Sequence, residues 1–337
     1  CDFSTNLCFG SNGGAIYQRG SASLRISDTR FEGNQANFGG AIFMFEDSVD
    51  ISTLVVERCF FNFNVAEQQA GGINISNSDV YISNCLLANG IVSSGTVGGA
   101  ISTNASNGDS SQVVLLNSTL YGNVAVIGAG VAQWTDSDTS SMTLMSQNNI
   151  YANVGENYSI ESGSPVFVSN GGNLSTDLSL SLFATQANDF HATLPLLLDP
   201  DVDDFRLQNG SPCIDNGTEQ DAPEEDINGD PRMGKPDIGA YEFDSTVATS
   251  NIDRTVLVQV FPNPVVDELT VQWEDSAHGK ALVDVYDLNG RLMKTRTVNK
   301  VSDLATLSFD VRDLPEGKYQ ILIRQGARKF VGSFIKV

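Results

Sequence analysis

A repeat of about thirty residues constrains this chain more than any other feature of its sequence. Each unit opens with an aromatic or aliphatic residue followed three positions later by Asn, and a Gly-Gly pair comes next. The opening positions are Phe3, Phe31, Phe61, Leu87, Leu120 and Ile150. A fixed period of this length is typical of solenoids, in which each repeat stacks on its neighbours.

A third, short apolar segment completes each unit, as in "SLRIS" at 23–27 and "TLVVE" at 53–57. Alternating β-branched residues favour strands, whereas helical repeats would need amphipathic runs of ten or more residues. Three short strands per unit predict an all-β chain. We expect residues 1 to about 170 to form a right-handed parallel β-helix, and the whole β-helical part to extend to residue 243.

The repeated Asn predicts a ladder of side chains. Equivalent positions in neighbouring coils lie about 4.8 Å apart, so Asn amides can hydrogen-bond from one coil to the next. The candidates are Asn6, Asn34, Asn64, Asn123 and Asn153, and Gly90 replaces Asn in the fourth unit. The stacking geometry favours an internal structural row over the alternative of a sugar-binding row.

Two motifs of the repeat carry a family resemblance. Phe-x-x-Asn, as in "FEGN" from Phe31, and Gly-Gly-Ala-Ile, as at 39–42 and 98–101, resemble the polymorphic outer membrane protein repeats of chlamydiae. The resemblance covers roughly half of the chain and implies surface display and adhesion. These motifs specify a scaffold rather than a reaction.

The charge distribution excludes some partners. The net charge is −22; residues 1–243 hold 7 Lys and Arg against 29 Asp and Glu, whereas 244–337 hold 12 of each. No basic residue lies between Arg58 and Arg206. We therefore expect no binding of nucleic acid or anionic lipid by charge. The N-terminus shows neither a signal peptide nor a membrane span, and because Cys1 falls inside a repeat we expect more coils to precede it.

The five cysteines are predicted to be small structural residues. Cys1, Cys59 and Cys85 stand two residues before an opening position, and Cys8 falls in the slot of Ala36. Other units fill the first of these slots with Thr29, Ser118 and Asn148. An odd count without Cys-x-x-Cys favours neither a disulfide framework nor a zinc site. A disulfide between Cys59 and Cys85, in adjacent coils, stays open.

The segment 196–243 leaves the repeat. Its "SPCID" and "DIGAYEF" resemble the ending of bacterial choice-of-anchor β-helix proteins, and we expect it to cap the solenoid, whose open end would expose strand edges. Within it Asp226, Asn228, Asp230 and Asp237 have the spacing of a calcium loop, although Pro231 stands where such loops have Gly. Calcium is therefore the one cofactor considered, and a plain turn before "IGAYEF" is the alternative.

An enzyme is the alternative function, because many β-helix proteins cleave acidic polysaccharides. Asp203 and Asp204 form an acidic pair, but the Gly-His-Gly and Arg-x-Lys companions typical of polygalacturonases are missing. His191 and His278 lie in different domains and do not suggest a shared triad. Carboxylate pairs formed between coils are invisible in the sequence, so the alternative stays open.

Residues 255–337 alternate as about seven strands with polar turns, which predicts a small antiparallel β-sandwich of the immunoglobulin type. Asn289-Gly290 is a strong hairpin signal. The Ser- and Thr-rich stretch 244–254 reads as a linker between the two domains.

The C-terminal domain carries a closer resemblance, over nearly its whole length. "VFPNPVVDELTVQ", "VDVYDLNGRLM" and "DLPEGKYQILI" are similar to the type A C-terminal sorting domain of type IX secretion in Bacteroidota. The matching motif residues are Pro262, Asn263, Pro264, Gly290, Gly317, Lys318 and Tyr319. The resemblance implies export through the periplasm to the cell surface, with the type IX machinery as partner.

Taken together, these features predict an exported cell-surface β-helix protein that acts as an adhesin or structural surface element. Its expected partners, besides the secretion machinery, are a surface glycan, another cell surface or a second copy of itself.

Overall fold

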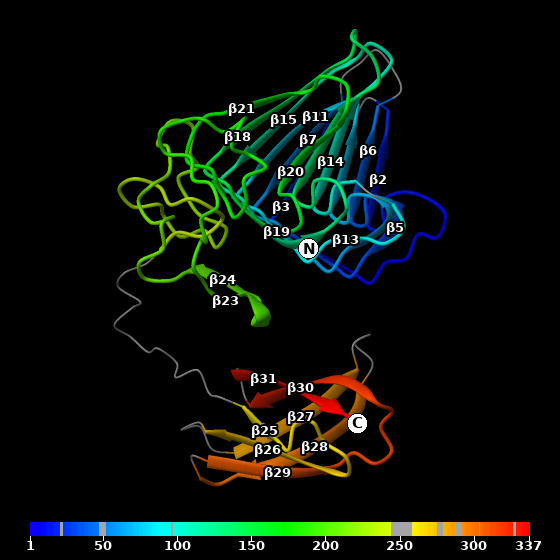
Figure 1. Cartoon of the computed structure of the whole chain (residues 1–337), viewed down its shortest axis with the longest axis vertical. Helices are drawn as coiled ribbons and strands as arrows, with labels where there is room; N and C mark the ends of the chain where they lie inside the picture. The colour runs from blue at the N-terminus through cyan, green and yellow to red at the C-terminus, as the bar shows by residue number, and fades with distance from the viewer. Residues whose placement is uncertain are drawn as a thin grey trace. The chain divides into compact units, whose positions relative to one another are not determined.

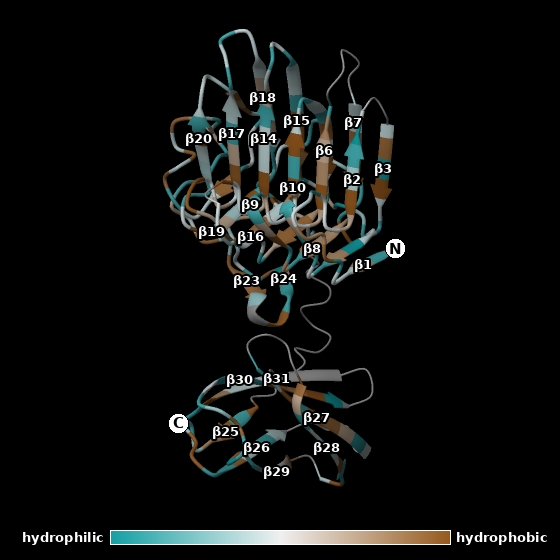
Figure 2. Cartoon of the chain, turned by 90° about the vertical axis from the view of Figure 1, so that its right-hand side faces the viewer, coloured by the Kyte–Doolittle hydropathy of each residue, from teal (hydrophilic) through white to brown (hydrophobic). Residues whose placement is uncertain are grey.

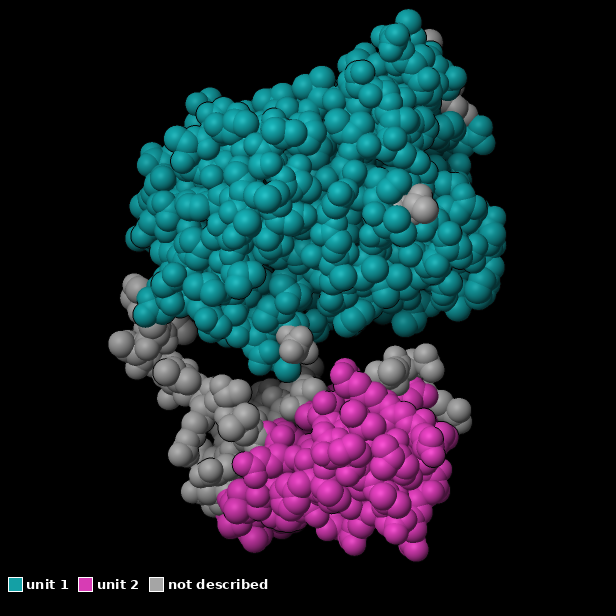
Figure 3. Space-filling view, in the orientation of Figure 1, with its two compact units in different colours: residues 1–243 teal, residues 244–337 magenta. Residues whose placement is uncertain are grey.

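The computed structural model describes residues 1–20, 23–46, 52–95, 97–243, 258–274, 279–287, 292–302, 304–325 and 328–337. The chain divides into two compact units, Cys1–Phe243 and Asp244–Val337 (Figure 3). The linker predicted for 244–254 lies outside the described residues.

Three parallel sheets build the solenoid of the first unit; the first takes two short strands from several coils, and the second and third take one strand from each. The first sheet contains β1 (Asp2–Ser4), β4 (Arg30–Glu32), β5 (Gln35–Phe38), β8 (Phe60–Asn62), β9 (Val65–Gln69), β12 (Leu86–Ala88), β13 (Ile91–Val92), β16 (Thr119–Val124), β19 (Ile150–Val154) and β22 (Leu174–Ser175).

The second sheet contains β2 (Ile16–Arg19), β6 (Ile42–Phe45), β10 (Ile73–Ser76), β14 (Ile101–Ala105), β17 (Val131–Thr135) and β20 (Tyr158–Ser162), which lie side by side in Figure 2. The third contains β3 (Ser23–Ser27), β7 (Ser52–Glu57), β11 (Ser78–Ser83), β15 (Ser110–Leu116), β18 (Ser141–Gln147) and β21 (Val166–Ser169), which are neighbours in Figure 1. The predicted parallel β-helix is thus confirmed.

The opening residues of the repeat stack inside the solenoid. Phe3 pairs in register with Phe31, and Phe31 with Phe61; their rings are stacked with centroids 5.2 and 4.6 Å apart. The same row continues through Leu87 and Leu120. Because like side chains repeat at each coil, one apolar row runs along the core.

Glycine is required at both positions of the Gly-Gly pair, for two different physical reasons. Gly39 adopts a φ of 63°, which favours glycine, and a Cβ on Gly40 would lie 2.3 Å from the carbonyl oxygen of Gly71 in the next coil. The pair is therefore a sharp corner with close backbone packing, and not a phosphate-binding loop.

One register prediction is wrong. The sixth unit was expected to open at Ile150, but Leu120 pairs with Tyr151, and Ser118 therefore aligns with Asn149 rather than Asn148. The register between β16 and β19 shifts after Tyr121: Tyr121 pairs with Ala152 and Val124 with Val154, so two residues of the fifth coil lie opposite a single residue of the sixth. Tyr151 is fully buried in the core row.

The segment after the last coil differs from the expected cap. Residues 176–190 close the core at this end: Leu180 is fully buried, and the Phe183 ring lies 4.9 Å from that of Tyr158 in β20. Residues 196–243 instead cover the outer face of the first sheet, where Phe205 and Ile238 pack with outward-facing Leu86 and other apolar residues.

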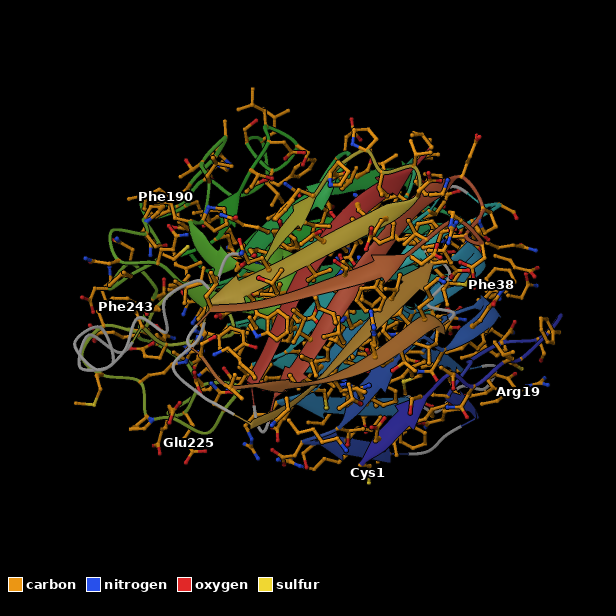
Figure 4. All side chains as sticks on the ribbon, turned by 90° about the horizontal axis from the view of Figure 1, so that it is seen from below. Cys1, Arg19, Phe38, Phe190, Glu225 and Phe243 are labelled. Carbon is orange, nitrogen blue, oxygen red and sulfur yellow. The ribbon has the colours of Figure 1, made fainter. Side chains whose placement is uncertain are left out.

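This covering segment contains one antiparallel hairpin, β23 (Leu197–Asp199) and β24 (Asp204–Leu207), joined through the short 3-10 helix Pro200–Val202. Figure 4 places the labelled Phe190, Glu225 and Phe243 on one side of the first unit and Arg19 and Phe38 on the other. The face lined by Arg19 and Phe38 is thus remote from the covering segment.

The second unit is the predicted antiparallel sandwich. Its three-stranded sheet contains β25 (Gln259–Phe261), β26 (Glu268–Glu274) and β29 (Leu304–Asp310). Its four-stranded sheet contains β27 (Gly279–Asp287), β28 (Leu292–Lys300), β30 (Gly317–Gln325) and β31 (Arg328–Lys336). Trp273, Val283 and Phe334 are fully buried in the core between them.

β27 and β28 pair antiparallel, while Asn289 and Gly290 between them lie outside the described residues. Among the residues that are described, no helix has the length and apolar character needed to cross a membrane.

Candidate functional site

The sorting motif residues of the second unit gather around its last strand. Asn263 follows β25, and its side-chain Oδ1 accepts a hydrogen bond of 2.9 Å from the backbone N–H of Ile335 in β31. Its Nδ2 donates to the carbonyl oxygen of Ser333 at 3.3 Å. The flanking Pro262 and Pro264 are both preceded by cis peptide bonds. The Pro-Asn-Pro segment therefore holds β31 through one amide side chain.

The second part of the motif holds the same strand from the other side. Gly317 and Lys318 begin β30 and pair with Lys336 and Ile335 of β31. The Tyr319 ring stacks on Phe334 with centroids 5.2 Å apart, and its hydroxyl donates to the carbonyl oxygen of Pro315 at 2.7 Å. Motif residues separated by more than fifty positions thus meet at the C-terminal strand; Gly290 is outside the described part of the chain.

The predicted Asn row is buried at Asn34, Asn64 and Asn123, partly buried at Asn153 and exposed at Asn6. Asn6 Nδ2 donates to Asn34 Oδ1 at 2.7 Å, and Asn34 Nδ2 donates to Asn64 Oδ1 at 2.9 Å. In the later coils Asn123 Nδ2 donates to Asn153 Oδ1 at 2.7 Å. The amides of Asn6, Asn34 and Asn123 thereby connect their coils to the following ones.

The row is interrupted at Gly90 and extended by a residue that the repeat did not reveal. The backbone N–H of Gly90 donates to Asn123 Oδ1 at 2.8 Å, but glycine has no side-chain amide that could hydrogen-bond to Asn64 in the third coil. Beyond Asn153, Asn157 continues the row by accepting from Asn153 Nδ2 at 2.9 Å. Because Asn157 follows Asn153 by only four residues, its place in the row is not visible from the period.

The four residues with calcium-loop spacing fall into two groups. Asp226 and Asp237 are each 1% exposed, whereas Asn228 and Asp230 are exposed. Asp226 Oδ1 accepts backbone N–H groups from Asn228 at 2.7 Å and Asp230 at 3.0 Å, and its Oδ2 accepts from Glu242 at 3.0 Å. Its carboxylate is thus occupied by the backbone of its own turn.

A buried arginine lies at the centre of this loop. The Arg232 guanidinium makes an ion pair of 3.0 Å with Glu242, and the two side chains are 3% and 8% exposed. It also donates to Asn84 Oδ1 at 2.9 Å and to the carbonyl oxygen of Gly239 at 3.0 Å. Arg232 is thus a buried cation held by Glu242, Asn84 and backbone carbonyl groups, and calcium binding by the four residues with calcium-loop spacing stays a prediction.

Burial also perturbs the second carboxylate of the loop. It raises the pKa of Asp237 to about 6, although backbone N–H groups of Asp215 and Phe243 donate to its oxygens. Within the described ranges, no group of three or more His, Cys, Asp or Glu is arranged to hold a metal ion.

The outer side of the second sheet carries an aromatic cluster at its N-terminal end. The Phe43 ring lies 5.4 Å from that of Tyr17 and 6.1 Å from that of Phe38. Tyr17 is 46% exposed, whereas Phe43 is buried beneath its neighbours. Arg19 lies over the ring of Phe45, 6.0 Å from its centroid.

Amides replace these aromatic residues one coil further on. Gln69 is the register partner of Phe38 and Asn74 that of Phe43, and Asn74 Nδ2 donates to Gln69 Oε1 at 3.1 Å. A depression of about 380 Å³ opens beside them. It is lined by Gln68, Gln69, Ser94, Gly95, Val97 and Glu161.

A second depression, of about 400 Å³, lies between the N-terminal coils and the covering segment. Among its charged residues, Arg58 Nε donates to Asp28 Oδ1 at 2.7 Å and Arg30 Nε to Glu32 Oε2 at 2.8 Å. Asp203 of the predicted acidic pair also lines it, and its Oδ1 accepts from Asn62 Nδ2 at 3.1 Å. The hydrogen bond from Arg58 lowers the pKa of Asp28, and those to the two carboxylates raise the pKa values of Arg30 and Arg58.

Comparison with known proteins identifies the second unit. The family described as "Secretion system C-terminal sorting domain" matches residues 259–337. A segment equal to 41% of the chain is 31% identical over 151 residues to a protein of Escherichia coli strain K12 described as probable autotransporter YfaL, of which it covers 12%. The chain thus spans a small part of that relative.

The matched family confirms the type IX sorting domain and the export that it directs, to the cell surface or into the medium. The chain is therefore an exported protein in which a parallel β-helix is followed by a type IX secretion C-terminal sorting domain.

Proposed function

We propose that the β-helix acts outside the cell as an adhesin, or as a structural surface element, that binds a neutral surface glycan. The supporting observation is the depression beside Gln69 with the aromatic cluster of Tyr17, Phe38 and Phe43 one coil before it. Amide and hydroxyl groups match the hydroxyls of a sugar, and an exposed aromatic face packs against its C–H groups.

The charges of the depression select against acidic ligands. Glu161 is the one charged residue among those that line it, and burial raises the pKa of its carboxyl above the usual value. With no Lys or Arg in the lining and a net charge of −22 on the whole chain, a uronate or sulfated glycan would be repelled. The ligand class that fits is an uncharged, hydroxyl-rich chain.

The same observations weaken the alternative of a polysaccharide-active enzyme. Glycoside hydrolysis uses two carboxyl groups, one of them with a raised pKa, whereas a single carboxyl lines the depression beside Gln69. In the second depression the pKa of Asp28 is lowered and those of Arg30 and Arg58 are raised, which is opposite to what a general acid or an arginine base needs.

The test is binding of the full chain to immobilised neutral and uronate-containing polysaccharides. We expect binding to the neutral set, and a loss of about tenfold with Tyr17→Ala or Gln69→Ala, the effect of one stacking or hydrogen-bonding contact. Leu182→Ala is the matched control, because Leu182 is 85% exposed but belongs to the segment that closes the core.

Binding that both variants retain, or that favours acidic polymers, would contradict the proposal. Release of unsaturated or reducing ends from either set would support the enzyme instead. Concentration-dependent oligomers without any glycan binding would point to self-association.

A further inference from the structure

Two buried thiols stand in register in adjacent coils. Cys59 and Cys85 are both fully buried and directly precede Phe60 and Leu86, which pair in register in β8 and β12. The backbone N–H of Leu86 donates to the carbonyl oxygen of Cys59 at 3.0 Å. The two Cα atoms are therefore separated by one strand spacing, about 4.8 Å, inside the range of about 4.4–6.8 Å found in disulfides.

The Cys85 thiol points toward the coil that holds Cys59. Cys85 Sγ donates to the carbonyl oxygen of Val56, in the coil that holds Cys59, at 3.6 Å. A hydrogen bond between the two thiols lowers the pKa of Cys59, whereas burial raises the pKa of Cys85. The side chain of the later cysteine thus leans toward the earlier one.

No other pair among the five cysteines has this relation. Thr29 occupies the coil between Cys1 and Cys59, because Arg30 N–H donates to the Cys1 carbonyl and Phe60 N–H to that of Thr29. Cys8 aligns with the row of small residues that contains Ala36. Cys213 packs in the separate apolar cluster outside the first sheet.

The interface between these two coils is also the one at which the Asn row is broken. The Asn34 side chain accepts a hydrogen bond from Asn6 in the preceding coil and donates one to Asn64 in the following coil. Gly90, at the next position of the row, has no side chain that could accept a hydrogen bond from Asn64. The Asn row is therefore broken between the third and fourth coils, which Asn89 Nδ2 still joins by donating to Asn62 Oδ1 at 2.9 Å. A covalent bond between Cys59 and Cys85 would supply a link between the same two coils.

We propose that in the exported protein Cys59 and Cys85 form a disulfide that staples the third coil to the fourth. Export takes the chain through an oxidising compartment in which protein disulfides form. Since both thiols are inaccessible once the coils have stacked, the bond forms before folding is complete.

The reaction is a thiol–disulfide exchange with a disulfide-bearing oxidant, such as an oxidised dithiol oxidoreductase or oxidised glutathione. The thiolate of one cysteine of the pair, here written as Cys59, attacks one sulfur of the oxidant and expels the other as a thiolate. The Cys85 thiolate then attacks Cys59 Sγ in this mixed disulfide and expels the second thiolate. Two protons pass from the pair to the expelled thiolates, one S–S bond forms, and the oxidant gains the two electrons and leaves as two thiol groups.

The test is cysteine mapping of the full chain recovered from the exported fraction and alkylated in denaturant without a reductant. Because no Lys or Arg lies between Arg58 and Arg206, trypsin leaves both cysteines in one peptide, whereas cleavage after Glu67 separates them. We expect these two peptides to be joined and the other three cysteines to be alkylated. Cys213→Ser, the control, should keep the cross-link.

Two further variants keep the test decisive. Cys59→Ser and Cys85→Ser should each free the remaining partner for alkylation, and both should fold because Ser118 fills the same slot in the fifth coil. Protein refolded with oxidised glutathione should melt roughly 5–10 °C above protein refolded with a reductant, and the double variant should lose this difference. Complete alkylation of Cys59 and Cys85 in the exported protein, or a different pairing, would overturn the proposal.

Discussion

Replacing Asn64 with Ala tests whether the Asn row holds the coils together. Asn64 is 1% exposed. Its Oδ1 accepts from Asn34 Nδ2 at 2.9 Å and from the Asn34 backbone N–H at 3.0 Å, and its Nδ2 donates to the Phe31 carbonyl oxygen at 2.9 Å. The substitution removes all three bonds and leaves their partners buried.

Three lost hydrogen bonds at about 0.5–1.5 kcal/mol each, in a site where the partners stay buried, predict a loss of about 2–4 kcal/mol in the free energy of unfolding of the first unit. Asn209→Ala is the control, since Asn209 is exposed in the covering segment, and its effect should stay within about 0.5 kcal/mol. Glycan binding by the folded variant should equal that of the wild type.

The measurement is urea unfolding combined with hydrogen exchange of peptides that contain 31–34. Exchange separates the first unit from the sorting domain, which unfolds as a separate body, and detects local opening between coils. A change below 1 kcal/mol, with unaltered protection of the Asn34 amide, would refute the structural role. A loss of glycan binding at full stability would make the row a recognition surface instead.

Three other predictions concern the sorting domain and the acidic loop. Residues 244–337, placed behind a signal peptide and a fluorescent reporter, should carry the reporter to the surface of a type IX-competent host but not of a translocon mutant. Asn263→Ala should reduce the surface fluorescence because β31 loses its two hydrogen bonds to the Asn263 side chain. A reporter retained in the periplasm of the wild-type host would contradict this prediction. Arg232→Met should destabilise the first unit by about 3–5 kcal/mol because it leaves the buried Glu242 carboxylate unpaired. A chelator should leave the melting temperature of the wild type unchanged. A decrease in melting temperature on chelation that Asp226→Ala abolishes would support calcium binding instead. Burial raises the pKa of Asp237 to about 6, so the contribution of its protonated carboxyl to stability is full below about pH 4, the unfolded pKa, and is lost as the pH rises through about 6. Asp237→Asn should therefore flatten the pH dependence of the free energy of unfolding between these values. An unchanged slope would contradict the raised pKa.

The local pattern of the sequence was enough to predict the solenoid and the sandwich. A residue such as Phe31 recurs at each coil because parallel stacking places like side chains in one row, so the period itself encodes the neighbours. The Gly-Gly corner, Asn34 in its row and the seven strands of the sorting domain follow from the same short-range signals. Each of these features depends on residues within one repeat or one hairpin.

Contacts between distant segments were decided only by the tertiary structure. The outward-facing Leu86 and Ile150 look like ordinary strand residues in the sequence, but they are apolar and must be covered, so residues 196–243 lie along the first sheet rather than over the end of the solenoid. The shift to Tyr151 arises from the loss of one residue in a coil, which the alternation of strands does not reveal. The spacing of acidic residues likewise could not show that Arg232 is buried against Glu242 and Asn84, because burial of this charge depends on the packing of the whole loop against the coils.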